Sequence, residues 1–104
     1  MSYDVTFGPT IEEPSRNYTS NVSGMWADAI GENLGDLIER LGKRAGDILP
    51  ALERGIAAME ADPDKYRAMN PANGWGDYDG ALAYLRWMRD NCRDWPETSC
   101  TVSR

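Results

Sequence analysis

The stretch Tyr3-Asp4-Val5-Thr6-Phe7 decides between two fold classes for this chain. Apolar and polar residues alternate along it, and aromatic and β-branched side chains predominate. This alternation is typical of a half-buried β-strand, with Tyr3, Val5 and Phe7 facing one way. Without such a strand, the helical segments that follow would be read as an all-helical protein.

The C-terminal tail supplies a partner for that strand. Residues 99–103 alternate in the same way, with Cys100 and Val102 on one side. We therefore predict an α+β fold, in which the N-terminal and C-terminal strands form a short antiparallel ribbon. Because an isolated two-stranded ribbon is marginal in water, helices must pack on it. The segments with helical periodicity are 24–41, 47–61 and 78–94. These three amphipathic helices complete a single domain over residues 1–104, and the alternative is an all-α small helical bundle with extended ends.

The segment 24–41 has the clearest amphipathic pattern. Ser23 is its predicted N-cap. Gly31 and Gly35 lie beside the apolar stripe, and each costs about 1 kcal/mol relative to alanine inside a helix. They predict either a close approach by another helix or an aromatic ring, or a kink. At 100° per residue the apolar face consists of Trp26, Ile30, Leu34, Leu37, Ile38 and Leu41. The opposite face consists of Asp28, Glu32, Asp36 and Glu39.

Capping and proline signals delimit the later helices. Asp47 is the predicted cap of the helix 47–61, with Pro50 in its first turn. Asp62-Pro63-Asp64 predicts a short turn of helix, and Asp77 or Asp79 is expected to cap the helix 78–94. The side chains predicted to point inward from these segments are Ile48, Leu49, Leu52, Ile56, Met59, Tyr66, Met69, Ala81, Tyr84, Leu85, Met88, Cys92 and Trp95.

The residue types that are present and missing restrict the function. The chain has 17 acidic and 11 basic residues, a net charge of −6 that repels phosphate backbones, so no direct nucleic-acid binding is expected. Histidine, the commonest general base and metal ligand, is absent. Asp77 and Asp79 are better explained as caps than as a carboxylate pair for acid–base or Mg²⁺ chemistry. We predict no catalytic residue, no metal and no cofactor.

The cysteines and the hydropathy indicate the compartment. Cys92 and Cys100 are too few for a closed zinc site, and we expect free thiols, with a disulfide as the alternative. No apolar run approaches the roughly 20 residues that span a bilayer. The first residues also lack the features of a secretory signal. A soluble, cytoplasmic protein without a membrane partner is expected.

Two segments without helical periodicity concentrate amide and aromatic side chains. Residues 10–21 are polar and are predicted to be a loop, and residues 70–80 connect two helices with glycine and proline turn chemistry. Amides, glycine N–H groups, an indole and phenols can hold a small polar planar ligand by stacking and edge hydrogen bonds. The candidate ligand-binding residues are Asn17, Tyr18, Asn21, Asn70, Asn73, Trp75 and Tyr78. The alternative is a self-satisfied loop in which Trp75 fills the core.

Three stretches also carry a resemblance. These are Asn17-Tyr18-Thr19-Ser20-Asn21, Pro63-Asp64-Lys65-Tyr66 and the segment 70–78. They resemble small uncharacterised proteins of actinobacterial phages and prophages, over most of the chain, without a motif of assigned chemistry. The resemblance implies an inhibitor or sequestering protein, acting in the cytoplasm of the bacterial host, rather than an enzyme.

The sequence thus leads to one main hypothesis and one alternative. The main hypothesis is a non-catalytic protein that holds or sequesters a small polar, nucleotide-like ligand or a host protein segment. The alternative is an acidic interaction protein that uses its Glu- and Asp-rich helix face to block a basic surface of a host protein. An enzyme is the third choice. A homodimer is a further hypothesis, because a small helical domain with glycine-lined faces can bury more surface by pairing.

Overall fold

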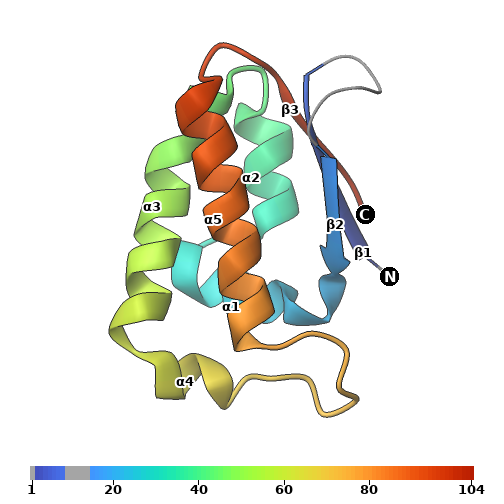
Figure 1. The fold of residues 1–104 in the computed structure, drawn as a ribbon, viewed down its shortest axis with the longest axis vertical. Helices are drawn as coiled ribbons and strands as arrows, with labels where there is room; N and C mark the ends of the chain where they lie inside the picture. Colours follow the sequence, from blue (N-terminus) through green and yellow to red (C-terminus); the bar gives the residue numbers. More distant parts are fainter. Residues whose placement is uncertain (1, 9–14) are drawn as a thin grey trace.

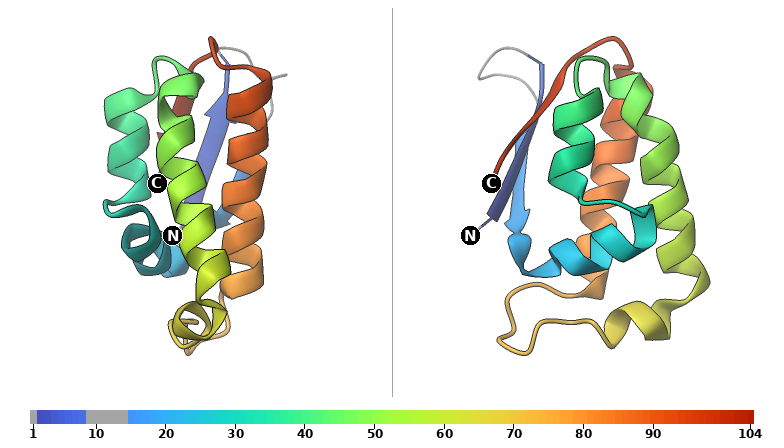
Figure 2. Two further views of the ribbon diagram at one scale, coloured as in Figure 1. Left: turned by 90° about the vertical axis from the view of Figure 1, so that its left-hand side faces the viewer. Right: turned by 180° about the vertical axis from the view of Figure 1, so that it is seen from behind.

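Helices cover one face of a three-stranded antiparallel sheet. The structure, a computed structural model, describes residues 2–8 and 15–104. Strand β1 (Ser2–Phe7) lies between β2 (Ser15–Thr19) and β3 (Cys100–Ser103) (Figure 1). The helices of the described residues all lie on one side of this sheet, with α3 furthest from it (Figure 2). The helices are η1 (Ser20–Val22), α1 (Ser23–Ile30), α2 (Leu34–Leu41), α3 (Ala45–Ala61), α4 (Pro63–Arg67) and α5 (Tyr78–Asp94). The fold is α+β, as predicted.

The terminal strands pair as the alternation indicated. Val5 lies opposite Val102, and Phe7 lies opposite Cys100, in an antiparallel register. Tyr3, Val5 and Phe7 are buried, whereas Asp4 between them is exposed. One face of the sheet therefore contributes its apolar residues to the core, which is what a period of two in the sequence requires.

Strand β2 corrects the prediction of a loop over residues 10–21. Residues 15–19 pair with β1, so that Tyr18 lies opposite Tyr3 and Arg16 opposite Val5. Residues 10–14 of the predicted loop lie outside the described residues. β2 is a polar edge strand, and it lacks the apolar alternation by which a strand is recognised. Its pairing with β1 and a hydrogen bond to Tyr84 hold it in place.

The segment 24–41 forms two helices instead of one. Gly31 ends α1 with a φ of 96°, a left-handed conformation that favours glycine. Asn33 then caps α2 by accepting a hydrogen bond from the Asp36 N–H (3.1 Å). Gly35 leaves room for the Arg104 guanidinium, which occupies the place of its missing Cβ. Ser23 is the first residue of α1 and makes no capping hydrogen bond, so its predicted role is wrong.

The start of α3 also differs from the prediction. This helix begins at Ala45 and has no side-chain cap, so Asp47 lies within its first turn and Pro50 lies beyond it. Carbonyl groups of the segment before β3 replace the cap: the Ala45 N–H donates to Thr98 O (2.8 Å) and the Gly46 N–H to Pro96 O (2.9 Å). A long-range contact of this kind leaves no local signature in the sequence.

The caps of the last two helices agree with the sequence. The Asp62 carboxylate accepts from Lys65 N at the start of α4, with Pro63 in the first turn. The Asp77 carboxylate accepts from Gly80 N (2.7 Å) at the start of α5. Asp79 is instead 3.8 Å from Arg67 in an exposed ion pair.

The core is centred on an aromatic stack. Trp26 is fully buried, and Tyr84 stacks on it with ring centroids 5.4 Å apart. Two side chains that were predicted to point inward are exposed, Met69 by 38% and Trp95 by 60%. Both follow the end of a helix, since α4 ends at Arg67 and α5 ends at Asp94, so the helical period no longer places them.

A pair of glycine substitutions tests the helix packing. A Cβ on Gly55 of α3 would lie 2.7 Å from Cγ1 of the buried Ile30, whereas a Cβ on Gly24 of α1 meets nothing within 4 Å. We expect Gly55→Ala to lower the free energy of unfolding in urea by about 1–3 kcal/mol, because overpacking outweighs helix propensity. Gly24→Ala should raise it by up to about 1 kcal/mol. Equal effects of the two substitutions would contradict the close packing at Gly55.

Candidate functional site

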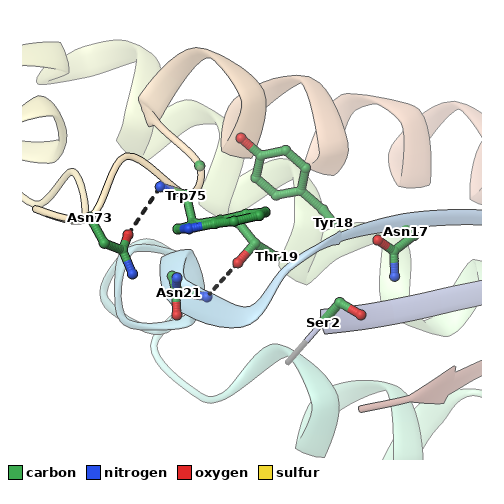
Figure 3. A pocket seen from close by; sticks show the side chains of 8 residues that line it. Ser2, Asn17, Tyr18, Thr19, Asn21, Asn73 and Trp75 are labelled. Carbon is green, nitrogen blue, oxygen red and sulfur yellow. Dashed lines mark hydrogen bonds between the residues drawn. The ribbon is translucent and has the colours of Figure 1, made fainter.

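An open cavity lies where the loop between α4 and α5 passes the end of β2. It has a volume of about 650 Å³ (Figure 3). Its lining comes from two segments far apart in the sequence, β1–β2–η1 and the loop before α5. The lining residues are Ser2, Asn17, Tyr18, Thr19, Asn21, Asn73, Trp75 and Gly76. Five of the seven predicted ligand-binding residues are among them: Asn17, Tyr18, Asn21, Asn73 and Trp75.

Trp75 is the most exposed large apolar side chain among the described residues, with 68% of its surface accessible. It therefore does not fill the core. Figure 3 shows its indole amid the lining residues, with Tyr18 on one side and Asn21 and Asn73 on the other. The Asn73 Oδ1 accepts from the Trp75 N–H (3.0 Å) and fixes the turn that presents the indole. The indole N–H makes no hydrogen bond to any residue in the described ranges.

Tyr18 joins the cavity wall to the core. Its ring stacks on Tyr84 with centroids 5.8 Å apart and planes inclined by 27°. Its hydroxyl oxygen accepts from the Asp77 N–H (3.2 Å) at the start of α5. The phenol occupies the space that a Cβ on Gly80 would fill. This wall is consequently fixed by stacking, a hydrogen bond and close packing before any ligand arrives.

The three lining asparagines differ in how many hydrogen bonds their side chains already make within the protein. The Asn17 Nδ2 donates to Tyr3 O (3.3 Å) and to the Asp4 carboxylate (3.0 Å). The Oδ1 of Asn73 already accepts the Trp75 N–H. The side-chain amide of Asn21 makes no hydrogen bond within residues 2–8 and 15–104, and the residue is exposed. Asn21 and the Nδ2 of Asn73 thus present donors and an acceptor to the cavity.

Asn70 and Tyr78 do not line the cavity. The Asn70 Oδ1 accepts from the Tyr78 N–H (2.8 Å). Tyr78 is only 5% exposed, and its hydroxyl donates to Met59 O (2.7 Å). The Arg67 guanidinium lies over its ring, 4.9 Å from the centroid. These two predicted residues attach the loop to α3 and α5, and so support the cavity from behind.

Sequence reasoning missed three lining residues. Ser2 and Thr19 face each other across β1 and β2, and they could not be placed without predicting β2. Gly76 has a φ of 91°, and a Cβ there would lie 2.5 Å from Thr19 Cγ2 and 2.9 Å from Val22 Cγ1. Its signal was the second glycine of Asn-Gly-Trp-Gly, which allows the loop to approach η1 closely.

The chemistry of the cavity is that of neutral hydrogen bonding and stacking. Its lining contains amides, hydroxyls, a phenol and an indole, and none of the eight side chains is charged. The thiols lie elsewhere, in the core, as free cysteines, and burial raises the pKa of Cys92 to about 12. Burial likewise raises the pKa of Cys100. Within the described part of the chain, no cluster of three His, Cys, Asp or Glu side chains could hold a metal ion.

Three cations of the same chain pair with the four carboxylates of the predicted acidic face. Asp28 pairs with Lys65 (2.9 Å), and the Arg104 guanidinium lies 2.9 Å from both Asp36 and Glu39. Glu32 pairs with Arg40. All four carboxylates that were predicted to form the acidic surface therefore have a cationic partner. Such exposed pairs add little stability, but they reduce the negative field that a basic partner would meet.

Comparison of the chain with family models, with curated proteins and with solved structures gives no match. No family-wide role can therefore be transferred to the cavity residues. Across the described ranges, none of the helices combines the length and the apolar character needed to cross a membrane.

Glycine substitutions in the loop test its contact with η1. Gly74 and Gly76 both have positive φ, but a Cβ on Gly74 would meet nothing within 4 Å. Gly74→Ala should cost about 1 kcal/mol of unfolding free energy from backbone strain alone. Gly76→Ala should cost a further 1–3 kcal/mol or so, because the added methyl displaces Thr19 or the loop. Urea unfolding measures both. A Gly76→Ala chain as stable as Gly74→Ala would contradict the observed close approach.

A carboxylate substitution tests the contacts that Asp28 of α1 makes with Lys65 and Tyr66 of α4. Hydrogen bonds from Lys65 and Tyr66 lower the pKa of Asp28 below its ordinary value of 3.8. A lowered pKa in the folded state stabilises the fold above pH 3.8, and this contribution is lost as the pH falls through the lowered pKa. Asp28→Asn should therefore make the unfolding free energy less dependent on pH below 3.8. Glu53→Gln is the control, since the Glu53 side chain makes no ion pair in the described part of the chain, and it should leave the profile unchanged. If Asp28→Asn leaves the pH dependence of the unfolding free energy unaltered, the stabilising contacts of Asp28 with Lys65 and Tyr66 are contradicted.

Proposed function

We propose that this chain is a non-catalytic binding protein that holds a small polar ligand, nucleotide-like in its flat ring and hydrogen-bonding edges, in the Trp75 cavity. The observation that carries the proposal is the 68% exposure of Trp75 over a lining of amides and hydroxyls. An exposed indole presents a broad apolar face to water, and stacking on a ligand ring would cover it. The volume of about 650 Å³ lies within the usual range of small-molecule pockets.

The surroundings of Trp75 favour a small ligand over a host protein segment. A stable protein interface buries about 800 Å² on each partner and usually has an apolar centre. Trp95, the next most exposed aromatic side chain, lies at the C-terminal end of α5, whereas Trp75 precedes its N-terminal end. The two therefore do not form one apolar patch. Binding of a host protein segment at this cavity is accordingly the weaker proposal.

The role we propose for binding is sequestration of the ligand. The cavity offers stacking and hydrogen bonds but no side chain arranged as a nucleophile, general acid or general base. The resemblance to phage and prophage proteins points the same way, since it implies an inhibitor or sequestering protein. The internal pairing of Asp28, Glu32, Asp36 and Glu39 makes the alternative, an acidic surface that blocks a basic host protein, the weaker proposal.

Two tryptophan substitutions test the proposal. Binding of a panel of nucleosides, nucleotides and monosaccharides is screened by thermal shift and measured by calorimetry. Trp75→Ala should weaken binding of any hit about ten-fold or more, because base–aromatic stacking contributes roughly 1–3 kcal/mol. Trp95→Ala removes an indole of similar exposure at the other end of α5 and should leave the affinity unchanged.

The outcomes separate the candidates. If no compound binds, or if Trp75→Ala binds as tightly as the original chain, the proposed function is wrong. If the panel is silent and a basic host protein binds in a salt-sensitive manner, the acidic-surface alternative is supported instead. Turnover of a panel compound would show that the protein is an enzyme.

A further inference from the structure

We infer that the Trp75 cavity selects uncharged ring ligands, such as a free nucleoside or a sugar, and rejects phosphorylated forms of the same ring. This inference rests on the proposed function, and it narrows the ligand class by charge. The proposed ligand then resembles a nucleotide in its ring but carries no phosphate.

The first argument is the lining itself. Phosphate groups in protein sites are held by Arg or Lys side chains, or by a row of backbone N–H groups at a helix N-terminus. None of the eight lining residues is Arg or Lys. Two helices begin beside the lining. At the start of η1 the Asn21 N–H donates to the Thr19 hydroxyl, and at the start of α5 the Asp77 carboxylate accepts the Gly80 N–H and the Tyr18 hydroxyl accepts the Asp77 N–H. Those donors are therefore already used.

Two aspartates contact residues of the lining. The Asp4 carboxylate accepts a hydrogen bond from the lining residue Asn17 (3.0 Å). Asp77 contacts Tyr18 through its backbone, and both aspartates are exposed. A phosphate in the cavity would approach these carboxylates without a compensating cation among the described lining residues, in a chain whose net charge is −6.

The neighbouring cations are directed elsewhere. Arg16 precedes Asn17 in β2, and its register with Val5 places it on the opposite face of the sheet from Asn17, two residues further from η1 than Tyr18 on that face. Arg67 lies over the Tyr78 ring and 3.8 Å from Asp79. Arg104 is engaged by Asp36 and Glu39.

The outer face of the sheet continues the uncharged lining of the cavity along the strands. This outer face includes Ser2, Asn17 and Thr19 of the lining. The strand registers place further residues on it, which are Asp4, Thr6, Ser15, Thr101 and Ser103. This face carries hydroxyls, one amide and one carboxylate, and no described helix covers it (Figure 2). A substituent that extends from a bound ring along the sheet would meet neutral groups and Asp4 only. Hydroxyl groups of a ribose or pyranose suit such a surface, and a phosphate does not.

Paired ligands test the inference. The probes are adenosine, uridine, glucose and galactose, each measured by calorimetry beside its monophosphate, 5′ for the nucleosides and 6 for the sugars. The uncharged member of any pair that binds should have an affinity about ten-fold higher or more, because like charges are brought together in the phosphorylated complex. Whether the nucleosides or the sugars bind identifies the source of the ring.

A gain-of-function substitution tests the reason for the selectivity. The Asn21 amide makes no hydrogen bond within the described residues, so Asn21→Lys places a cation in the lining without removing an internal contact. It should raise the affinity for the monophosphate about ten-fold relative to the affinity for the uncharged partner. Ala57→Lys is the matched control, since it adds the same charge at an exposed position of α3 and should leave both affinities unchanged.

Each result has a distinct consequence. A monophosphate that binds the original chain as tightly as its uncharged partner overturns this inference and leaves the proposed function standing. The inference is also overturned if Asn21→Lys improves monophosphate binding no more than Ala57→Lys does. If no member of any pair binds, the proposed function falls, and this inference falls with it.

Discussion

Tyr84 stacks on Trp26 at the centre of the molecule and reaches the sheet with its hydroxyl group. The rings of the two residues are 5.4 Å apart, and the Tyr84 hydroxyl donates to Arg16 O (2.7 Å), with Tyr3 O as a more distant acceptor (3.3 Å). Burial raises the pKa of Tyr84, so the hydroxyl keeps the proton it donates. Through this side chain, α5 holds β2, a polar edge strand that has little apolar surface of its own. Apart from this hydroxyl, the pairing with β1 and the contacts of Tyr18 with Trp26 and Asp77 fix β2.

The cavity depends on that attachment. Tyr18 packs against both rings of this cluster, with its centroid 5.8 Å from that of Tyr84 and 6.2 Å from that of Trp26, so the position of β2 determines the position of the cavity wall. Gly80 admits the Tyr18 phenol at the start of α5, and Gly76 lets the loop that carries Trp75 approach η1. The stationary parts of the cavity are thus packed into the core, while the indole lies exposed at the surface. Such preorganisation reduces the entropy lost when a ligand binds.

The sequence predicted those elements whose buried side chains recur at the regular spacing of a strand or a helix. β1 and α5 were placed correctly because Tyr3, Val5 and Phe7, and the buried side of α5, repeat at strand and helix spacing. β2 could not be recognised, since pairing and a contact from Tyr84 hold it in place. For the cavity, Trp75 and Tyr78 carry the same signal, an aromatic residue in a glycine-rich turn. Contacts that the sequence does not reveal, such as the hydrogen bond from the Tyr78 hydroxyl to Met59 O, distinguish the buried residue from the exposed one. The role of the cavity residues in binding remains a prediction.

The central claim is that the exposed indole of Trp75 and the asparagine amides around it form one ligand site. Side-chain N–H resonances in a proton–nitrogen NMR spectrum report on these groups directly, one by one. On titration with the tightest-binding nucleoside or sugar, the resonances of the Trp75 indole and of the Asn17, Asn21 and Asn73 amides should shift together along one binding curve. The Trp95 indole, at the other end of α5, should not move. Shifts centred on Trp95, or no shift at Trp75 when ligand is saturating, would contradict the account.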